Sequence, residues 1–147
     1  MTTPSSPTAL RALREDLFVT NESGSPVALQ GTRCLDCSRV FFPSRLICSH
    51  CGSATRMVQH RLSELGVVHA STVVRVPSAL GHVAPYTYGY VDLPEDGTRI
   101  FAPFSGAALT AFAPGVKVRL TFGEIPASSM QGVLGYSFVP AMKDCHV

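Results

Sequence analysis

The chain has 147 residues, a length that fits one compact domain or a small module attached to a modest core. Its formal net charge is only +2, from 12 basic and 10 acidic side chains, and this balance does not favour binding to a long polyanion. No apolar run approaches the roughly 20 residues of a membrane-spanning helix, and Met1–Pro7 lacks the features of a signal peptide. We therefore expect a cytoplasmic protein with reduced cysteines.

The composition is unusually poor in charge. Hydrophobic residues make up 46% of the chain and charged residues 15%, against a typical charged share of about 25%. A small domain has much surface to cover, so we expect another protein to cover part of this apolar surface. A well-packed monomer with a weakly charged surface is the alternative that composition leaves open.

The N-terminal segment carries a helical pattern. Leu10, Leu13 and Leu17 form one apolar stripe, and Ser6–Pro7 supplies a cap and a first helical residue. We predict a short helix that ends before the turn at Asn21–Pro26. A helix this short is marginal alone, so its stripe must dock either on this chain or on a partner, and the sequence does not decide which.

Two Cys-x-x-Cys pairs follow, Cys34 with Cys37 and Cys48 with Cys51, and ten residues separate them. Each pair can turn back and offer two thiolates to one tetrahedral ion, which is the spacing of a zinc ribbon. Disulfides would need an oxidising compartment, and a redox motif would need only one pair in a βαβ setting. Four cysteines close the coordination shell, so we expect a structural Zn²⁺.

Short strands around 28–33 and 40–42 are predicted to flank the first cysteine pair. We expect His50, inside the second pair, to point outward, because four cysteines already suffice as ligands. Zinc binding would supply much of the free energy that orders the segment. The side chains expected to pack against the metal site are Phe41, Phe42, Leu46 and Ile47.

The remainder of the chain has the pattern of strands and turns. Five strands are predicted, at 67–76, 86–92, 98–104, 116–122 and 134–139. The second and third form a hairpin, and a broken connection before the fourth suits a small closed Greek-key barrel of the OB type. The predicted fold class is mainly β, with an N-terminal helical arm at 1–27, a zinc ribbon at 28–58 and an OB-fold domain at 59–147.

A catalytic centre is not evident. The sequence has no G-x-S-x-G, no phosphate-binding glycine motif and no H-E-x-x-H, and its five histidines are scattered. Cys145 stands alone near the end and is expected to be an inert surface thiol rather than a nucleophile. We therefore predict no catalytic residue in this chain.

Tyr86, Tyr88 and Tyr90 alternate along one predicted strand and so share a face. Such a row can pack in a core or against a partner, contact a small molecule, or stack bases as single-strand-binding OB folds do. No basic residue interleaves the tyrosines, so core or partner packing is the favoured interpretation.

Several stretches resemble the DUF35 family, which joins a rubredoxin-like zinc ribbon to an acyl-CoA-associated OB fold. The resemblance extends over about residues 28 to 141, and two differences stand out: the family's two-helix start is shortened, and Ser38 replaces a glycine that often follows the first cysteine pair. The stretches that carry the resemblance are Arg33–Cys37, Phe42–Ser53, Gly66–Val74, Pro85–Leu93 and Pro114–Val118.

Membership of this family would imply an accessory subunit that works beside a thiolase-like enzyme, scaffolds the complex and helps form the path of the acyl-CoA. Some members instead accompany hydratases or aldolases that act on CoA thioesters. The resemblance thus implies a hetero-oligomer whose catalytic partner supplies the nucleophile. A single-stranded nucleic-acid-binding OB module is the alternative from a different functional class.

Within that reading, Arg39 and Arg45 are candidate contacts for the phosphates of CoA. Ordinary solvated charges are the simpler explanation of both side chains. The ligands of the structural Zn²⁺ would be Cys34, Cys37, Cys48 and Cys51.

Overall fold

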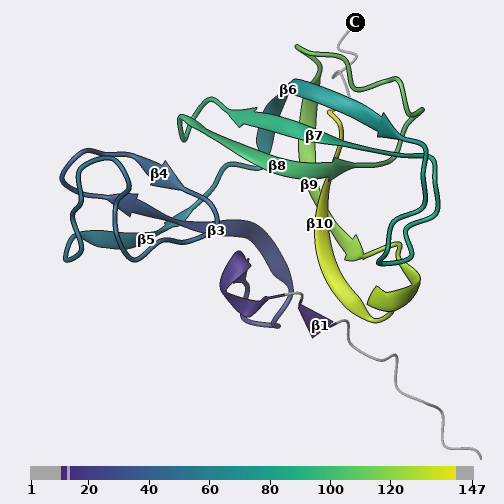
Figure 1. The fold of residues 1–147 in the computed structure, drawn as a ribbon. Helices are drawn as coiled ribbons and strands as arrows, with labels where there is room; N and C mark the ends of the chain where they lie inside the picture. The colour runs from purple at the N-terminus through teal and green to yellow at the C-terminus, as the bar shows by residue number, and fades with distance from the viewer. Residues whose placement is uncertain (1–10, 13, 142–147) are drawn as a thin grey trace, which may run out of the picture.

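The computed structural model describes residues 11, 12 and 14–141. The described residues form ten β-strands and two 3₁₀ turns, with no α-helix among them, and a ribbon unit lies beside a barrel (Figure 1). The ribbon unit and N-terminal arm contain β1 (Arg11–Ala12), η1 (Glu15–Leu17), β2 (Phe18–Thr20), β3 (Pro26–Cys34), β4 (Val40–Phe41) and β5 (Met57–Arg61). The barrel contains β6 (Leu65–Val74), β7 (Tyr86–Leu93), β8 (Thr98–Phe104), β9 (Lys117–Glu124), η2 (Ser128–Met130) and β10 (Val133–Pro140).

The barrel is closed. β7 pairs antiparallel with β6 and β8, while β9 pairs antiparallel with β6 and β10. β10 closes the sheet against β8 through one parallel pair, Phe138 with Phe104. The expected five-stranded closed barrel is therefore confirmed, with strand ends within two residues of the predicted ones.

Inward-facing residues of the barrel strands build the core. On β9, Val118 and Leu120 are buried and alternate with exposed Lys117 and Arg119, as a half-buried strand requires. Phe112, from the connection between β8 and β9, stacks on Phe104 with ring centroids 4.6 Å apart. Burying one such ring contributes about 1.5–3 kcal/mol, so this connection adds to the core.

The ribbon unit is organised around β3. β5 pairs antiparallel with β3 from Gln30 to Cys34, while β4 pairs with it at Thr32 and Arg33. β5 was not among the predicted strands. Its segment is largely exposed and lacks a clean alternation, so only its pairing with β3 defines it.

The N-terminal helix prediction is wrong for the described residues. Glu15–Leu17 forms a 3₁₀ turn, and β2 then pairs antiparallel with β3, with Phe18 opposite Leu29. The Asn21 side-chain carbonyl closes the hairpin by accepting hydrogen bonds from the backbone N–H groups of Ser23 and Ser25. Strand pairing thus outweighs a weak leucine periodicity.

Of the predicted N-terminal leucine stripe, Leu17 lies among the described residues, and it docks on this chain. Its side chain is 5% exposed and belongs to the same core cluster as the barrel residues. Leu10 and Leu13 lie outside the described residues. The described part of the arm therefore packs on this chain.

Candidate metal centre

Four cysteine sulfurs converge at the tip of the ribbon. All four Sγ atoms lie within 4.8 Å of one another, and the pairs Cys34–Cys51 and Cys37–Cys48 are each 3.5 Å apart. Tetrahedral coordination at a Zn–S distance near 2.3 Å places sulfurs about 3.8 Å apart. The donor set therefore fits one zinc ion and leaves no ligand position open.

The two cysteine turns, which we call knuckles, have the same backbone geometry. In each knuckle the residue after the second cysteine has a left-handed backbone, with φ of 65° at Ser38 and 77° at Gly52. The matching hydrogen bonds are Ser38 N–H to Cys34 O at 2.7 Å, Gly52 N–H to Cys48 O at 2.9 Å, Cys34 N–H to Arg39 O at 2.9 Å and Cys48 N–H to Ser53 O at 2.9 Å. Both cysteine pairs thus present their sulfurs in the same way.

The clustered thiols differ in their pKa values. The backbone N–H of Cys51 contacts Cys48 Sγ at 3.5 Å and lowers the pKa of the Cys48 thiol to about 6. At Cys51, the N–H of Ser53 lowers the pKa, but the Cys34 sulfur, desolvation and the other two sulfurs together outweigh it and the pKa rises to about 12. Four thiolates this close need a positive ion to take up their charge.

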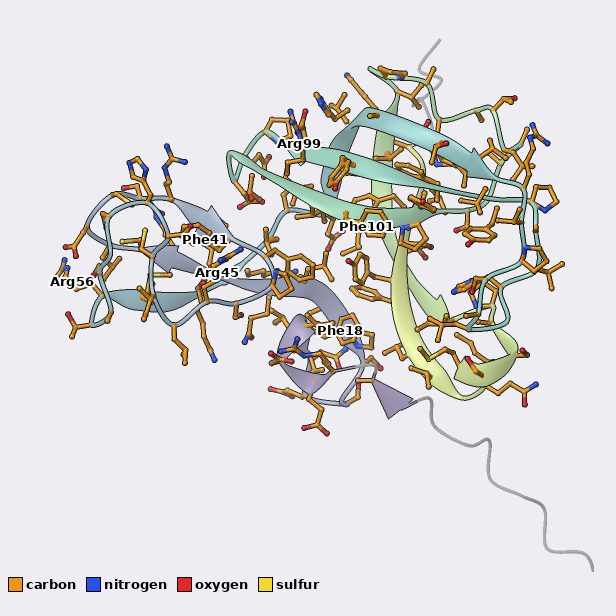
Figure 2. All side chains as sticks on the ribbon, viewed as in Figure 1. Phe18, Phe41, Arg45, Arg56, Arg99 and Phe101 are labelled. Atoms are coloured by element: carbon orange, nitrogen blue, oxygen red, sulfur yellow. The ribbon has the colours of Figure 1, made fainter. Side chains whose placement is uncertain are left out.

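The other predicted ribbon residues lie outside the sulfur cluster. His50 is exposed and is not one of the clustered side chains. Arg39 and Arg45 are also exposed, and neither forms a salt bridge within the described part of the chain. The Arg45 guanidinium lies over the Phe41 ring, 5.6 Å from its centre, which is within the range of a cation–π contact (Figure 2).

The expected packing of Leu46 and Ile47 against the metal site is wrong. Leu46 is 87% exposed and Ile47 is 58% exposed. Leu35, inside the first knuckle, is 49% exposed. We call these three side chains the ribbon apolar surface. Phe42 instead leaves the ribbon and packs edge-on against Tyr136 of β10, with ring centroids 5.8 Å apart.

The tyrosine row lies on the outside of the barrel, so a place in the core is excluded. Along β7, Thr87, Gly89 and Val91 are buried and the tyrosines lie on the opposite face. Tyr88 and Tyr90 flank Phe101 of β8, with ring centroids 5.1 and 5.8 Å from it. The row thus belongs to an aromatic cluster on the outer face of the barrel, half-buried at Tyr86 and Tyr88 and exposed at Tyr90.

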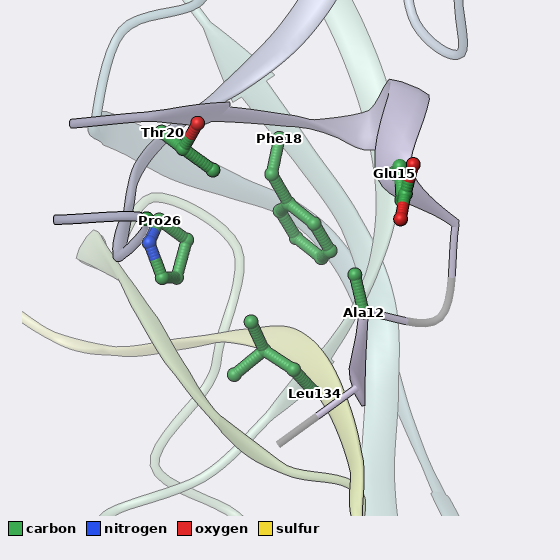
Figure 3. A pocket seen from close by; sticks show the side chains of 7 residues that line it. Ala12, Glu15, Phe18, Thr20, Pro26 and Leu134 are labelled. Atoms are coloured by element: carbon green, nitrogen blue, oxygen red, sulfur yellow. The ribbon is translucent and has the colours of Figure 1, made fainter. Parts of the chain in front are cut away.

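A shallow cavity of about 340 Å³ lies between the N-terminal arm and β10 (Figure 3). Sequence reasoning did not find it, because β2, the hairpin turn and β10 meet only in the folded chain. Its one charged side chain is Glu15, and no cysteine or histidine lines it. The lining residues are Ala12, Glu15, Phe18, Thr20, Gly24, Pro26 and Leu134.

Among the described residues, no serine, threonine or cysteine side chain forms a hydrogen bond with a histidine. Cys145 lies outside the described residues. No helix within the described ranges is long and apolar enough to cross a membrane.

Comparisons with known proteins agree with this architecture. Residues 28–56 match the family model described as ChsH2, rubredoxin-like zinc ribbon domain, and residues 59–123 match that described as ChsH2, C-terminal OB-fold domain. A solved structure described as an Ltp2–ChsH2(DUF35) aldolase has 27% sequence identity and a TM-score of 0.65, covering 78% of this chain and 86% of that one.

Two curated relatives are similar over most of their length. A DUF35 domain-containing scaffold protein from Methanothermobacter thermautotrophicus is 31% identical, over 75% of this chain and 83% of the relative. The benzoylsuccinyl-CoA thiolase subunit BbsA from Thauera aromatica is 34% identical, over 75% of this chain and 74% of the relative. With its zinc ribbon, its OB barrel and these relatives, the chain belongs to the DUF35 family.

Proposed function

We propose that this chain is a non-catalytic, zinc-binding accessory subunit of a thiolase-type complex that acts on a CoA thioester. The observation that carries the proposal is a closed four-sulfur site with exposed apolar side chains in and beside its cysteine turns. Leu35 lies between the first two cysteines, and Ile47 directly precedes the third. Similarity to BbsA, a thiolase subunit, supports the choice of partner.

In this proposal Cys34, Cys37, Cys48 and Cys51 bind one Zn²⁺, which supplies rigidity rather than chemistry. The ion would lock both knuckles and so hold the ribbon apolar surface in one shape for docking. The chain would then work as an arm at 1–27, a ribbon at 28–58 and a barrel at 59–147. The partner supplies the nucleophile, and the assembly is a hetero-oligomer in the cytoplasm.

Arg39 and Arg45 are the proposed contacts for the CoA phosphates. Both are exposed on the ribbon and free of salt bridges to the described residues, so their charge is available to a ligand. The contact of the Arg45 guanidinium with the Phe41 ring would limit the motion of this side chain and so reduce the entropy lost when it binds a phosphate.

The second candidate is the same role beside an aldolase that acts on a CoA thioester. The similarity to the Ltp2–ChsH2(DUF35) aldolase favours it. The two candidates share the metal site and the docking surface and differ only in the partner's reaction. Assays of thiolytic and retro-aldol cleavage on one purified complex separate them.

The test is to purify the full chain alone and together with a candidate thiolase-like partner, and to measure thiolytic cleavage of CoA thioesters. We expect no activity from this chain alone, and full activity only from the complex. Activity in this chain alone, or full activity of the partner without it, would refute the proposal.

A further inference from the structure

One buried carboxylate joins the ribbon unit to the barrel. Asp96 lies in the turn between β7 and β8, at the end of the barrel that faces the ribbon (Figure 1). Its Oδ1 lies 2.7 Å from Nε2 of His60, a residue of β5, and its Oδ2 accepts the backbone N–H of Ser63 at 2.8 Å. A carboxylate only accepts hydrogen bonds, so His60 is the donor.

The Asp96 side chain is not needed by its own turn. Backbone N–H groups of Asp96 and Gly97 both bind the carbonyl of Leu93, at 3.1 and 2.9 Å, and these bonds close the hairpin. The two carboxylate oxygens go instead to the ribbon strand and to the linker that follows it. With the Asp96 side chain only 7% exposed, water competes weakly for these bonds.

Two backbone hydrogen bonds hold the linker itself, Leu62 N–H to Leu29 O at 2.9 Å on the ribbon side and Leu120 N–H to Glu64 O at 2.8 Å on the barrel side. The remaining contacts near this junction include apolar ones. Leu62 precedes Ser63 in the linker, is 1% exposed and packs in the shared core. Apolar contacts are not directional and tolerate small rotations, whereas two hydrogen bonds to one planar carboxylate fix an angle. The carboxylate is therefore placed to set the orientation of the ribbon.

We propose that Asp96 is a positioning residue that holds the ribbon and the barrel in one fixed orientation through His60 and Ser63. This inference concerns the geometry of the isolated chain and does not depend on the proposed partner or its reaction. It has a test that needs neither.

The test measures backbone N–H residual dipolar couplings of the full, zinc-loaded chain in a weakly aligning medium. In the native protein, residues 30–61 and the barrel strands should fit one alignment tensor. In Asp96→Ala the ribbon set should lose that common fit, while Asp96→Asn, which can still accept from Ser63 and pair with His60, should restore it. A common, native tensor in Asp96→Ala, or an Asp96→Asn variant that behaves like it, would overturn the proposal.

Asp92→Ala is the matched control, because Asp92 lies on the same hairpin and its carboxylate binds Arg99 of β8 at 2.6 Å. That pair lies within the barrel, so its loss should leave the common tensor unchanged. A change as large as that in Asp96→Ala would count against the proposal.

A double-mutant cycle between His60 and Asp96 gives a second measurement. If Asp96→Ala does not fold, the dipolar couplings of the milder variant His60→Ala provide the readout. We expect His60→Ala to shift the ribbon tensor in the same direction, by less, because the bond to Ser63 remains. Unfolding constants of the two single variants and the double variant should deviate from additivity by roughly tenfold. Additive effects, or a native tensor in His60→Ala, would overturn the proposal.

Discussion

Ser38 and Gly52 occupy the same position in the two knuckles, and both have a left-handed backbone, yet only Ser38 has a side chain there. A residue with a Cβ is disfavoured in this region, while glycine enters it freely. The family's usual glycine at this position thus has a physical reason. The first knuckle forms in spite of a less favourable residue.

Ser38→Gly should therefore stabilise the zinc-loaded protein by about 0.5–1 kcal/mol, after the greater flexibility of glycine in the unfolded chain is subtracted. The matched variant Gly52→Ser should destabilise it by a similar amount, because a Cβ at Gly52 meets nothing within 4 Å and only the backbone is strained. Denaturant unfolding at fixed zinc concentration measures both. A destabilised Ser38→Gly would contradict this account.

Cys48→Ser should lose zinc and partner binding together. Removing one of four thiolates weakens tetrahedral coordination, and the ribbon depends on the ion for its order. Metal analysis of the purified protein and co-purification with the partner are the two measurements. His50→Ala, a neighbouring exposed side chain, is the control and should keep both properties. A zinc-free Cys48→Ser that still assembled a fully active complex would show that the ribbon does not mediate docking.

Leu46→Asp should weaken binding of the partner by roughly tenfold or more, as expected when a charge replaces an apolar side chain at an interface. Its effect on stability should be small, since Leu46 is 87% exposed. Val83→Asp is the control: Val83 is 80% exposed but lies in the loop between β6 and β7, at the other end of the barrel (Figure 1). Equal weakening by both variants would argue against the ribbon apolar surface as the docking site.

Tyr136→Phe should destabilise the protein by about 1 kcal/mol. The Tyr136 hydroxyl donates to the Phe101 carbonyl at 2.8 Å and so links β10 to β8, where the barrel closes through a single residue pair. Tyr90→Phe, on an exposed tyrosine, should have little effect and serves as the control. Urea unfolding near neutral pH measures the difference.

The same tyrosine should make stability depend on pH in alkaline solution. Burial raises the pKa of Tyr136 to about 12, above the ordinary value of about 10, so the folded state favours the neutral phenol. The contribution of this group is complete below pH about 10 and is lost as pH rises towards its folded pKa. Compared with the native protein, Tyr136→Phe should therefore lose less stability over that range. An identical alkaline decline in both proteins would contradict the assignment.

The features that the sequence predicted correctly rest on local patterns. Two residues between paired cysteines allow only a tight turn, so each pair brings its own two sulfurs together. The two pairs then meet because the strands that flank them, β4 and β5, both pair with β3. The barrel strands likewise show period-two alternation within themselves, as Val118 and Leu120 do on β9.

The features that sequence reasoning missed depend on contacts between distant segments. Met57–Arg61 forms a strand only because it pairs with β3. Phe18 likewise lies in a strand because β2 pairs with β3, where Phe18 is opposite Leu29. The turn residues at Asn21–Pro26 lie between two apolar runs and are a hairpin signal as well as a helix end, and in the structure they close the hairpin of β2 and β3. Leu46 shows the converse, since hydrophobicity indicates burial on average but not which apolar side chain stays exposed.

The packing of Leu62 between the ribbon and the barrel constrains how the sequence of this protein can evolve. Its backbone N–H binds the carbonyl of Leu29 at 2.9 Å, and both side chains, 1% and 0% exposed, pack in one cluster with Val91 and Leu93 of the barrel. A ribbon exchanged for that of a relative would have to match the volume of the barrel residues it meets. Substitutions at the base of the ribbon and inside the barrel are therefore coupled, and we expect the two units to be inherited together rather than shuffled as separate modules.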